Sequence, residues 1–372
     1  MKSMKIVLAA IMAASAAAGC CAYPAIRDFA SRTVLSASAL SGTTTDGWRF
    51  NYDDTHCEIT GAANTVIGDV TVPANITVTV DGAEKTLPVT VISTNSIRSN
   101  SRITGLTIPE GVQEIGEYAL SECPNLTTVS LPSSLLIIGG SAFGSDTALE
   151  TVSFSEGIRE VGGYAFKGCS SLKSVQLPST LTTIGRDAFN GCVSLTSANI
   201  PGKVAEPGPW AFAGCKALEK VTIEDGVKKL SSTFDGCTNL TELEFPASVS
   251  ALSYPFDEDC TYLTSVSVAN PDCEITFRTF AAEDTVTIYG YEGSTAEKYV
   301  TGLGEQDHVV FKSIGEKPVK PEIPDTGAFC DANGDGTITS GDAQYVLIYA
   351  TERLAGNNPS WRELTGNEKA PE

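Results

Sequence analysis

The sequence predicts a mainly β fold, a solenoid of coils of about 23 residues in which each coil contributes a short parallel strand. Three observations predict it. An aliphatic triplet such as Leu126, Val129 and Leu131 returns every 23 residues between Ile97 and Phe280, with one step of 22 residues. An Ala-Phe pair and an Ile-Gly or Val-Gly pair return in phase with the triplet, and Cys occupies a further position in most coils. A period of this length is typical of leucine-rich solenoids, whose coils bury their apolar sides against each other.

The triplet predicts a strand with one buried face. In the segment 126–131, Val129 faces one side, whereas Thr128 and Ser130 face the other. Pro132 cannot donate a hydrogen bond to a strand ladder, so it ends the strand. Repeated coil after coil, the outward positions should form one continuous polar strip. Its expected members are Thr128, Ser130, Thr151, Ser153, Ser174, Gln176, Ser197, Asn199, Lys220, Thr222, Glu242, Glu244, Ser265 and Ser267.

The other repeated residues belong to the return path of each coil. The Phe column is expected to fill the space between the two sides and contains Phe143, Phe166, Phe189, Phe212, Phe234, Phe256 and Phe280.

The Cys column contains Cys123, Cys169, Cys192, Cys215, Cys237 and Cys260, with Asp146 in its one gap. Stacked cysteines lie about 4.8 Å apart, but their Cβ atoms project in parallel, which a disulfide does not permit. We therefore expect a buried column of reduced thiols; five further cysteines lie outside it.

The pattern Val-x-Leu-Pro followed by Ile-Gly-x-x-Ala-Phe-x-Gly-Cys-x-x-Leu resembles the BspA-like leucine-rich repeats of bacterial surface proteins. The resemblance covers roughly residues 70 to 312. It departs from the pattern at Pro207–Trp210, and at Leu230 and Leu252 the following Gly is missing, so these turns are expected to be less regular. The resemblance implies a surface-exposed binding or adhesion role. Fold alone does not identify the ligand.

Residues 1–22 have the features of a secretory signal peptide. Lys2 and Lys5 precede the apolar run Ile6–Ala18, which is too short to span a membrane. Cleavage after Ala22 is one outcome. Ala17-Ala18-Gly19-Cys20 also resembles a lipoprotein box, in which Cys20 would carry a lipid anchor. We expect no transmembrane helix in the rest of the chain.

Each end of the solenoid needs a cap, because an end coil would otherwise expose its core. The N-terminal cap region is assigned to residues 23–69, the repeats to 70–282 and the C-terminal cap to 283–314. The expected elements are a loop over 37–47, strands at Trp48–Tyr52 and Cys57–Thr60, a hairpin around Asp81-Gly82, a strand at Val286–Gly290, a short helix opened by the capping box Ser294–Glu297, and a last strand at Val309–Ile314.

The C-terminal part contains a calcium motif. Residues 315–327 carry a proline at every third position and predict an extended linker. In the following module, residues 328–372, an EF-hand-like loop supplies Ca²⁺ ligands at Asp331, Asn333, Asp335, Thr337 and Asp342. Asp at the closing position, followed by an apolar helix over Asp342–Arg353, resembles a type I dockerin repeat. This resemblance implies a cohesin as partner. A dockerin normally has two repeats, so the chain is either truncated or ends in a half-dockerin.

The composition narrows the function. The chain has 25 basic and 45 acidic residues, a net charge of −20, which disfavours nucleic acid or anionic lipid as a partner. It has two histidines, His56 and His308, and lacks the common catalytic and zinc motifs, so we expect no enzyme.

The main hypothesis is an exported protein that binds a protein or polysaccharide. A cellulosome-like component and a structural surface-layer protein are the alternatives. The ligand surface is predicted at Ser174, Gln176, Asn199, Lys220, Thr222, Glu242 and Glu244.

Overall fold

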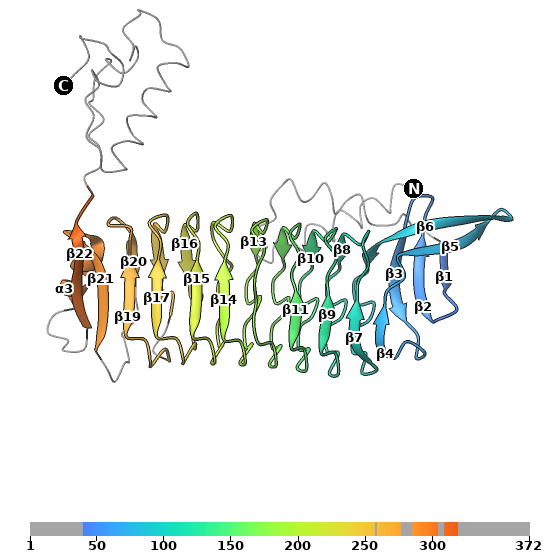
Figure 1. The fold of residues 1–372 in the computed structure, drawn as a ribbon, viewed down its shortest axis with the longest axis horizontal. Coiled ribbons are helices and arrows are strands. Elements are labelled where there is room, and N and C mark those ends of the chain that lie inside the picture. The colour runs from blue at the N-terminus through green and yellow to red at the C-terminus, as the bar shows by residue number, and fades with distance from the viewer. Residues whose placement is uncertain (1–39, 257–258, 277–284, 304–308, 319–372) are drawn as a thin grey trace, which may run out of the picture. The chain divides into compact units, whose positions relative to one another are not determined.

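The computed structural model describes residues 40–256, 259–276, 285–303 and 309–318. The chain divides into two compact units, Met1–Gly315 and Glu316–Glu372. The signal segment with Cys20, the calcium loop Asp331–Asp342 and the half-dockerin lie outside the described residues, as do Phe280 and His308. In the first unit, the coils stack one behind another and carry two rows of short strands (Figure 1).

The N-terminal end of the first unit is an antiparallel meander. The strands are β1 (Leu40–Thr43), β2 (Trp48–Tyr52) and β3 (Cys57–Ala62). β2 and β3 confirm the two predicted strands. β1 falls in the stretch 37–47, which we expected to be a loop, and that expectation is wrong for Leu40–Thr43. These residues lack strand periodicity, but β2 offers an open edge of backbone groups, which needs no side-chain pattern in its partner.

A hairpin projects from the first coil. It consists of β5 (Asn75–Val80) and β6 (Ala83–Ile92), paired antiparallel. Asp81 and Gly82 join them with φ angles of 51° and 80°. Both are left-handed, as the favoured two-residue hairpin turn requires, so the predicted hairpin is confirmed. The distal part of β6 pairs in parallel with β3 and β8 and links the hairpin to the solenoid.

The first wall consists of the strands formed by the aliphatic triplets, together with β4 (Gly68–Thr71) and the two cap strands β21 (Val286–Glu292) and β22 (Val309–Glu316). The triplet strands are β7 (Ile103–Thr107), β9 (Thr128–Ser130), β11 (Thr151–Ser153), β14 (Ser197–Ile200), β15 (Lys220–Ile223), β17 (Glu242–Phe245) and β19 (Ser265–Val268). Equivalent residues pair in register, for example Val129 with Val152. The hydrogen-bonded ladder is interrupted twice, after β11 and after β15, so the wall consists of three sheets.

The second wall is built from the Ile-Gly positions, which confirms that these residues lie on the return path. Its short strands are β8 (Glu114–Ile115), β10 (Ile137–Ile138), β12 (Glu160–Val161), β13 (Thr183–Ile184), β16 (Lys229–Ser231), β18 (Ala251–Ser253) and β20 (Glu274–Thr276). The row breaks between β13 and β16, where Pro207 occupies the place of Ile184 and has no N–H to donate. The predicted irregularity of this turn is thereby explained.

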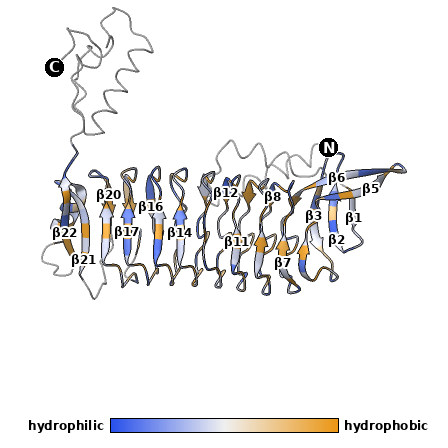
Figure 2. Cartoon of the chain, in the orientation of Figure 1, coloured by the Kyte–Doolittle hydropathy of each residue, from blue (hydrophilic) through white to orange (hydrophobic). Residues whose placement is uncertain are grey.

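The apolar core lies between the walls, and apolar and polar stretches alternate along the coils (Figure 2). The predicted Phe column is confirmed for the described residues. Successive rings of Phe143, Phe166, Phe189, Phe212 and Phe234 stack with centroid separations of 5.0, 5.2, 5.1 and 6.2 Å. Burying one Phe side chain contributes about 1.5–3 kcal/mol, so the column is a major source of stability.

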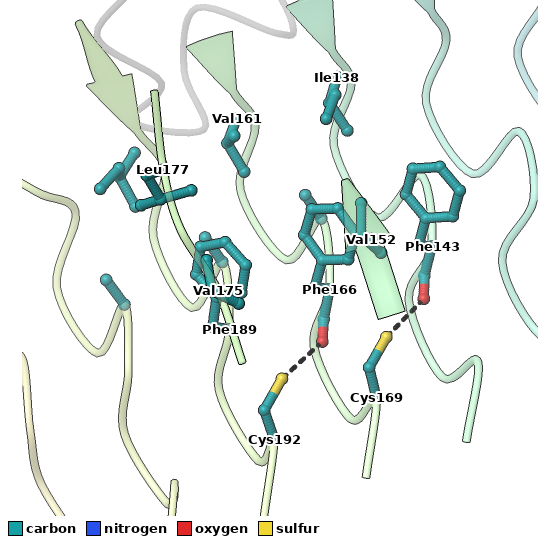
Figure 3. Packing of buried hydrophobic residues seen from close by; sticks show 14 of the residues in the cluster. Ile138, Phe143, Val152, Val161, Phe166, Cys169, Val175, Leu177, Phe189 and Cys192 are labelled. Carbon is teal, nitrogen blue, oxygen red and sulfur yellow. Dashed lines mark hydrogen bonds between the residues drawn. The ribbon is translucent and has the colours of Figure 1, made fainter. Parts of the chain in front are cut away.

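The Cys column is buried, and its six described cysteines form no disulfide, as the spacing predicted. Each thiol donates to a backbone carbonyl of the preceding coil, as Figure 3 shows for Cys169 and Cys192. The acceptor belongs to the Phe column, or for Cys123 is Ile97, which holds the equivalent place. The pairs are Cys123 with Ile97 (3.4 Å), Cys169 with Phe143 (3.1 Å), Cys192 with Phe166 (3.2 Å), Cys215 with Phe189 (3.3 Å), Cys237 with Phe212 (3.2 Å) and Cys260 with Phe234 (3.3 Å). Burial raises the pKa of the Cys169, Cys192 and Cys215 thiols well above the ordinary value, which keeps them protonated.

Asp146 takes the place of a cysteine in this column. It is fully buried, and its Oδ1 accepts a hydrogen bond of 2.7 Å from the backbone N–H of Cys123. Its Oδ2 is buried without a hydrogen-bond partner. Desolvation by burial raises the pKa of Asp146 to about 9. A carboxyl group at a position that elsewhere holds a thiol is therefore neutral at pH 7.

The C-terminal cap agrees with the predicted strand, helix and strand. β21 is followed by α3 (Thr295–Gly302) and then β22. Ser294 caps the helix by accepting from the N–H of Glu297 at 3.3 Å, and the Glu297 carboxylate accepts from the N–H of Gly293 at 2.6 Å. The predicted capping box is thus confirmed, with the carboxylate bonded one residue before the cap.

Candidate binding surfaces

The polar face of the first wall carries most of the predicted ligand surface. Ser174, Gln176, Lys220, Thr222, Glu242 and Glu244 are all exposed. Their alternation with buried residues follows from the strand period, as in β17, where Glu242 and Glu244 flank the buried Leu243. The structure therefore places these predicted residues on one outward face, although the underlying ladder is interrupted.

Asn199 was predicted on this face, and that prediction is wrong. The side chain is only 5% exposed, and it bonds both backbone groups of Leu177 in the preceding coil. Its Oδ1 accepts from the Leu177 N–H at 2.6 Å, and its Nδ2 donates to the Leu177 carbonyl at 2.9 Å. Residues 175–177 form no strand, so these backbone groups lack a ladder partner. An amide supplies both a donor and an acceptor and satisfies them.

A hollow of about 330 Å³ lies on the first wall across β4, β7, β9 and β11. Hydroxyl-bearing residues dominate its lining, with Asp69 at its edge, where the carboxylate accepts from the Thr104 hydroxyl at 2.7 Å. The polar lining residues are Asp69, Thr71, Thr107, Thr128, Ser130 and Ser153. This hollow was not predicted as a separate feature, because regular alternation alone does not show where a wall is concave.

A second surface lies at the turn that precedes each residue of the Phe column. One residue per coil there has a left-handed backbone, and we call this row the left-handed ridge. Its members are Asn95, Tyr118, Ser141, Tyr164, Asp187, Trp210, Ser232 and Tyr254, with φ between 47° and 61°. The row is in register: the N–H of Tyr118 donates to the Gly140 carbonyl at 2.9 Å, and that of Tyr164 to the Arg186 carbonyl at 2.8 Å. Each turn is thus bonded to the next coil.

Aromatic residues occupy every second position of the left-handed ridge. Tyr118, Tyr164 and Tyr254 are 41%, 38% and 40% exposed, and Trp210 is partly exposed. Three of these rings carry a cation over one face, at 4.6–5.3 Å from the ring centroid. The pairs are Arg98 with Tyr118, Lys167 with Tyr164, and Arg186 with Trp210. Such contacts orient the rings.

The cations of the left-handed ridge are themselves paired with carboxylates. Arg98 contacts Glu122, while Lys167 and Arg186 both contact Asp187, at 3.2 and 3.1 Å. Hydrogen bonds from Arg98 and Ser99 lower the pKa of Glu122, so this carboxylate is charged at neutral pH. A third carboxylate, that of Asp235, accepts from Trp210 Nε1 at 3.1 Å. Three cations and three carboxylates therefore lie together on the ridge, whereas the whole chain has a net charge of −20.

The sequence interpretation missed the left-handed ridge. The available signal was the residue immediately before the Ala of each Ala-Phe pair, which is aromatic in alternate coils. A search for residues that return in every coil overlooks a period of two coils.

Other classes of site receive no support in the part of the chain that the structure describes. Within residues 40–256, 259–276, 285–303 and 309–318, no cluster of three His, Cys, Asp or Glu side chains could hold a metal ion. Over the same ranges, no helix has both the length and the apolar character needed to span a membrane. The predicted Ca²⁺ ligands are beyond these ranges.

A comparison with solved structures finds several similar chains. Similar chains include a leucine rich repeat protein of T. pallidum (26% identity, TM-score 0.45, covering 56% of this chain and 90% of that one). A leucine-rich repeat protein from Bacteroides ovatus has 22% identity and a TM-score of 0.44, and the match covers 76% of this chain and 79% of that one. A leucine rich cell surface protein from Faecalibacterium prausnitzii has 20% identity and a TM-score of 0.43, and the match covers 75% of this chain and 96% of that one. No curated protein sequence matches the chain.

The repeats match a known family directly. The BspA type leucine rich repeat region matches residues 90–219 and 159–288, which together span more than half of the 372 residues. The matched segment contains the Phe column, the Cys column and most of both walls. The chain therefore belongs to the BspA type leucine rich repeat family.

Proposed function

We propose that this protein is an exported, non-catalytic repeat protein at the cell surface, which binds a protein or glycan ligand through the surface of its solenoid. The carrying observation is that outward side chains are presented in register, coil after coil, on the first wall and on the left-handed ridge. Stacked repeats create extended surfaces of this kind. The family itself is one of binding scaffolds, which supports the same proposal.

Ligand binding is tested with the full chain on arrays of host matrix proteins and plant polysaccharides. Capture of at least one class is expected, and capture of none contradicts the proposal. The triple variant Lys220→Ala, Glu242→Ala and Glu244→Ala then tests the first wall. A matched control replaces the exposed Lys228, Glu206 and Glu219 by Ala, which changes the charge equally but leaves the predicted ligand surface intact. If both variants bind a captured ligand as the native chain does, the first wall is not its site.

Export is supported by the sequence of residues 1–22. The positive start and the apolar run favour secretion, with cleavage after Ala22 and a lipid anchor on Cys20 as the two alternative outcomes. Expression of the native chain and of Cys20→Ser, followed by fractionation and mass spectrometry of the N-terminus, distinguishes the two. A lipid mass on the native chain alone supports the anchor. Cleavage after Ala22 in both chains contradicts it, and retention in the cytoplasm contradicts export.

A calcium-binding tail is a further part of the proposal, supported by the spacing of Asp331, Asn333, Asp335, Thr337 and Asp342. Without the ion the carboxylates would repel each other, so Ca²⁺ is expected to order the loop. Calorimetry of the full chain should show binding of one Ca²⁺ that Asp335→Ala abolishes. Equal heats from both chains would contradict the site. The alternative role as a cohesin partner is tested by adding a cohesin domain to the same two chains with Ca²⁺ present.

A further inference from the structure

The aromatic residues of the left-handed ridge occupy a backbone conformation that disfavours them. Asn and Asp adopt positive φ more readily than bulky residues. The intervening coils hold Asn95 and Asp187, together with the small residues Ser141 and Ser232. Tyr118 (φ 53°), Tyr164 (φ 61°) and Trp210 (φ 59°) adopt it with large side chains directed outward. Stacking of coils does not require this, because Ser141 and Asp187 serve the same turn. Strained residues of this type concentrate at ligand-binding sites.

The spacing of these rings is set by the stacking of the coils. Adjacent rings of the buried Phe column are 5.0 and 5.2 Å apart, which reports the advance per coil. Rings in alternate coils are therefore about 10 Å apart, twice the strand spacing. A chain that stacks on successive rings must repeat with about this length. The surface of an ordinary globular protein has no such one-dimensional repeat, whereas a linear polymer does.

The space between two rings is open. Tyr118, Ser141 and Tyr164 line a shallow hollow of about 250 Å³. Hydroxyl groups of Ser121 and Ser145 line it, together with the carboxylate of Glu122 and the ammonium of Lys167. These groups are hydrogen-bond donors and acceptors suited to hydroxyl groups. Since carboxylates contact all three ridge cations and Asp235 adds a further acidic group at Trp210, the surface favours a neutral ligand over a polyanion.

We infer that the left-handed ridge binds a neutral, extended β-1,4-linked glycan, which stacks sugar rings on Tyr118, Tyr164 and Trp210. In such a glycan successive sugars are turned over, so the same face recurs every second sugar, a disaccharide length comparable to the ring spacing. The C–H bonds of a pyranose face carry a partial positive charge and contact the negative face of an aromatic ring. The intervening sugar lies over the small residue of the ridge. This inference rests on the proposed function and specifies its ligand class.

The test is calorimetry of the full chain with neutral β-1,4-linked hexasaccharides of glucose, xylose and N-acetylglucosamine. The α-1,4-linked glucose hexasaccharide, which is coiled rather than extended, is the comparison probe. Tyr118→Asn and Tyr164→Asn remove the rings but keep the turn, since Asn95 occupies the same position in an earlier coil. Each change should weaken binding about tenfold, the scale of losing an aromatic anchor at an interface. Tyr262→Asn is the control, because Tyr262 is 62% exposed and lies outside the ridge.

A second variant tests the spacing itself. Tyr118→Ser combined with Ser141→Tyr keeps the number of rings but places two of them in adjacent coils. It should weaken binding as much as loss of one ring, and unchanged affinity would overturn the inference. Binding that survives both Tyr→Asn changes also overturns it. If the native chain captures a protein on the arrays but binds none of the β-linked probes, the glycan assignment fails and the proposed function stands. Capture of nothing in either assay defeats both.

Discussion

The buried columns and the left-handed ridge run along the same coils, yet they repeat differently. Phe143, Phe166 and Phe189 recur in every coil, and so do the cysteines that donate to their backbone carbonyls. The aromatic residues of the ridge recur in every second coil. A buried residue must fit the equivalent residue of each neighbour, so packing imposes a period of one coil. Packing does not require a period of two coils. We therefore attribute this period to the ligand that the ridge binds.

The two regions also differ in what their aromatic residues contribute to the stability of the fold. Stacked interior rings gain burial and about 0.5–1.5 kcal/mol per aromatic pair beyond it. On the ridge, the side chains of Tyr118, Tyr164 and Tyr254 are more than one third exposed. These residues also adopt positive φ, which costs conformational energy. Substitutions should therefore separate the regions cleanly: interior changes alter stability, and ridge changes alter binding.

The largest effect is expected at the centre of the Phe column. Phe166→Ala removes a fully buried ring that stacks on Phe143 and Phe189. The free energy of unfolding should fall by about 3–5 kcal/mol, measured by urea denaturation. A loss below about 1 kcal/mol would show that the column is not a main source of stability and would remove the contrast with the ridge.

A smaller gain is expected where the Cys column is interrupted. The pKa of Asp146 is about 9 in the folded chain and about 3.9 when unfolded, so the folded state keeps a proton that the unfolded state releases. The protonated Asp146 carboxyl therefore contributes its full stabilisation below about pH 4, and this stabilisation is lost as the pH rises toward 9. Asp146→Cys restores the column but removes the acceptor of the hydrogen bond from the Cys123 N–H. The cost of holding the carboxyl protonated is larger, so the free energy of unfolding at pH 7 should rise by about 1–3 kcal/mol.

Unfolding of both chains at pH 5 and pH 8 checks this prediction. The advantage of Asp146→Cys should be larger at pH 8, because only the native chain must then keep a buried carboxyl protonated. An equal difference at the two pH values would contradict the assigned pKa.

An effect of similar or smaller size is expected at the glycine beside β12. A Cβ at Gly162 would lie 2.7 Å from the backbone N of Gly140 and 2.8 Å from the carbonyl carbon of Gly139. Gly162→Ala should therefore destabilise by about 1–3 kcal/mol, since the coils must separate. Gly140→Ala is the matched control, because its nearest contact would be 3.4 Å away. Equal melting temperatures for the two variants would show that the coils are less tightly stacked than described.

The smallest effect on stability is expected on the ridge. Tyr164→Asn replaces a strained, partly exposed side chain by one that tolerates positive φ. The free energy of unfolding should change by less than about 0.5 kcal/mol, as at other surface sites. A loss comparable to that of Phe166→Ala would mean that the tyrosine is a structural residue, and the comparison between the two regions would no longer hold.

The sequence predicted the interior better than the surface. Phe166 and Cys169 could be assigned because most coils repeat them. Asn199 could not, because alternation does not reveal that the neighbouring segment lacks a ladder and needs an amide to bond Leu177. Leu40–Thr43 pairs through its backbone, which leaves no mark in the side chains. The ridge was missed for two reasons. The sequence does not reveal which residues adopt positive φ, and the aromatic residues of the ridge recur only in every second coil.

The alternation along the left-handed ridge also constrains how such a chain changes length. Duplication or deletion of one coil would leave both walls and both buried columns in register, because each coil presents the same interior to its neighbours. On the ridge it would place two rings or two small residues side by side and disrupt the order Tyr118, Ser141, Tyr164, Asp187, Trp210. A lineage under selection for this surface would therefore gain or lose coils in pairs, whereas one under selection for folding alone would vary by single coils.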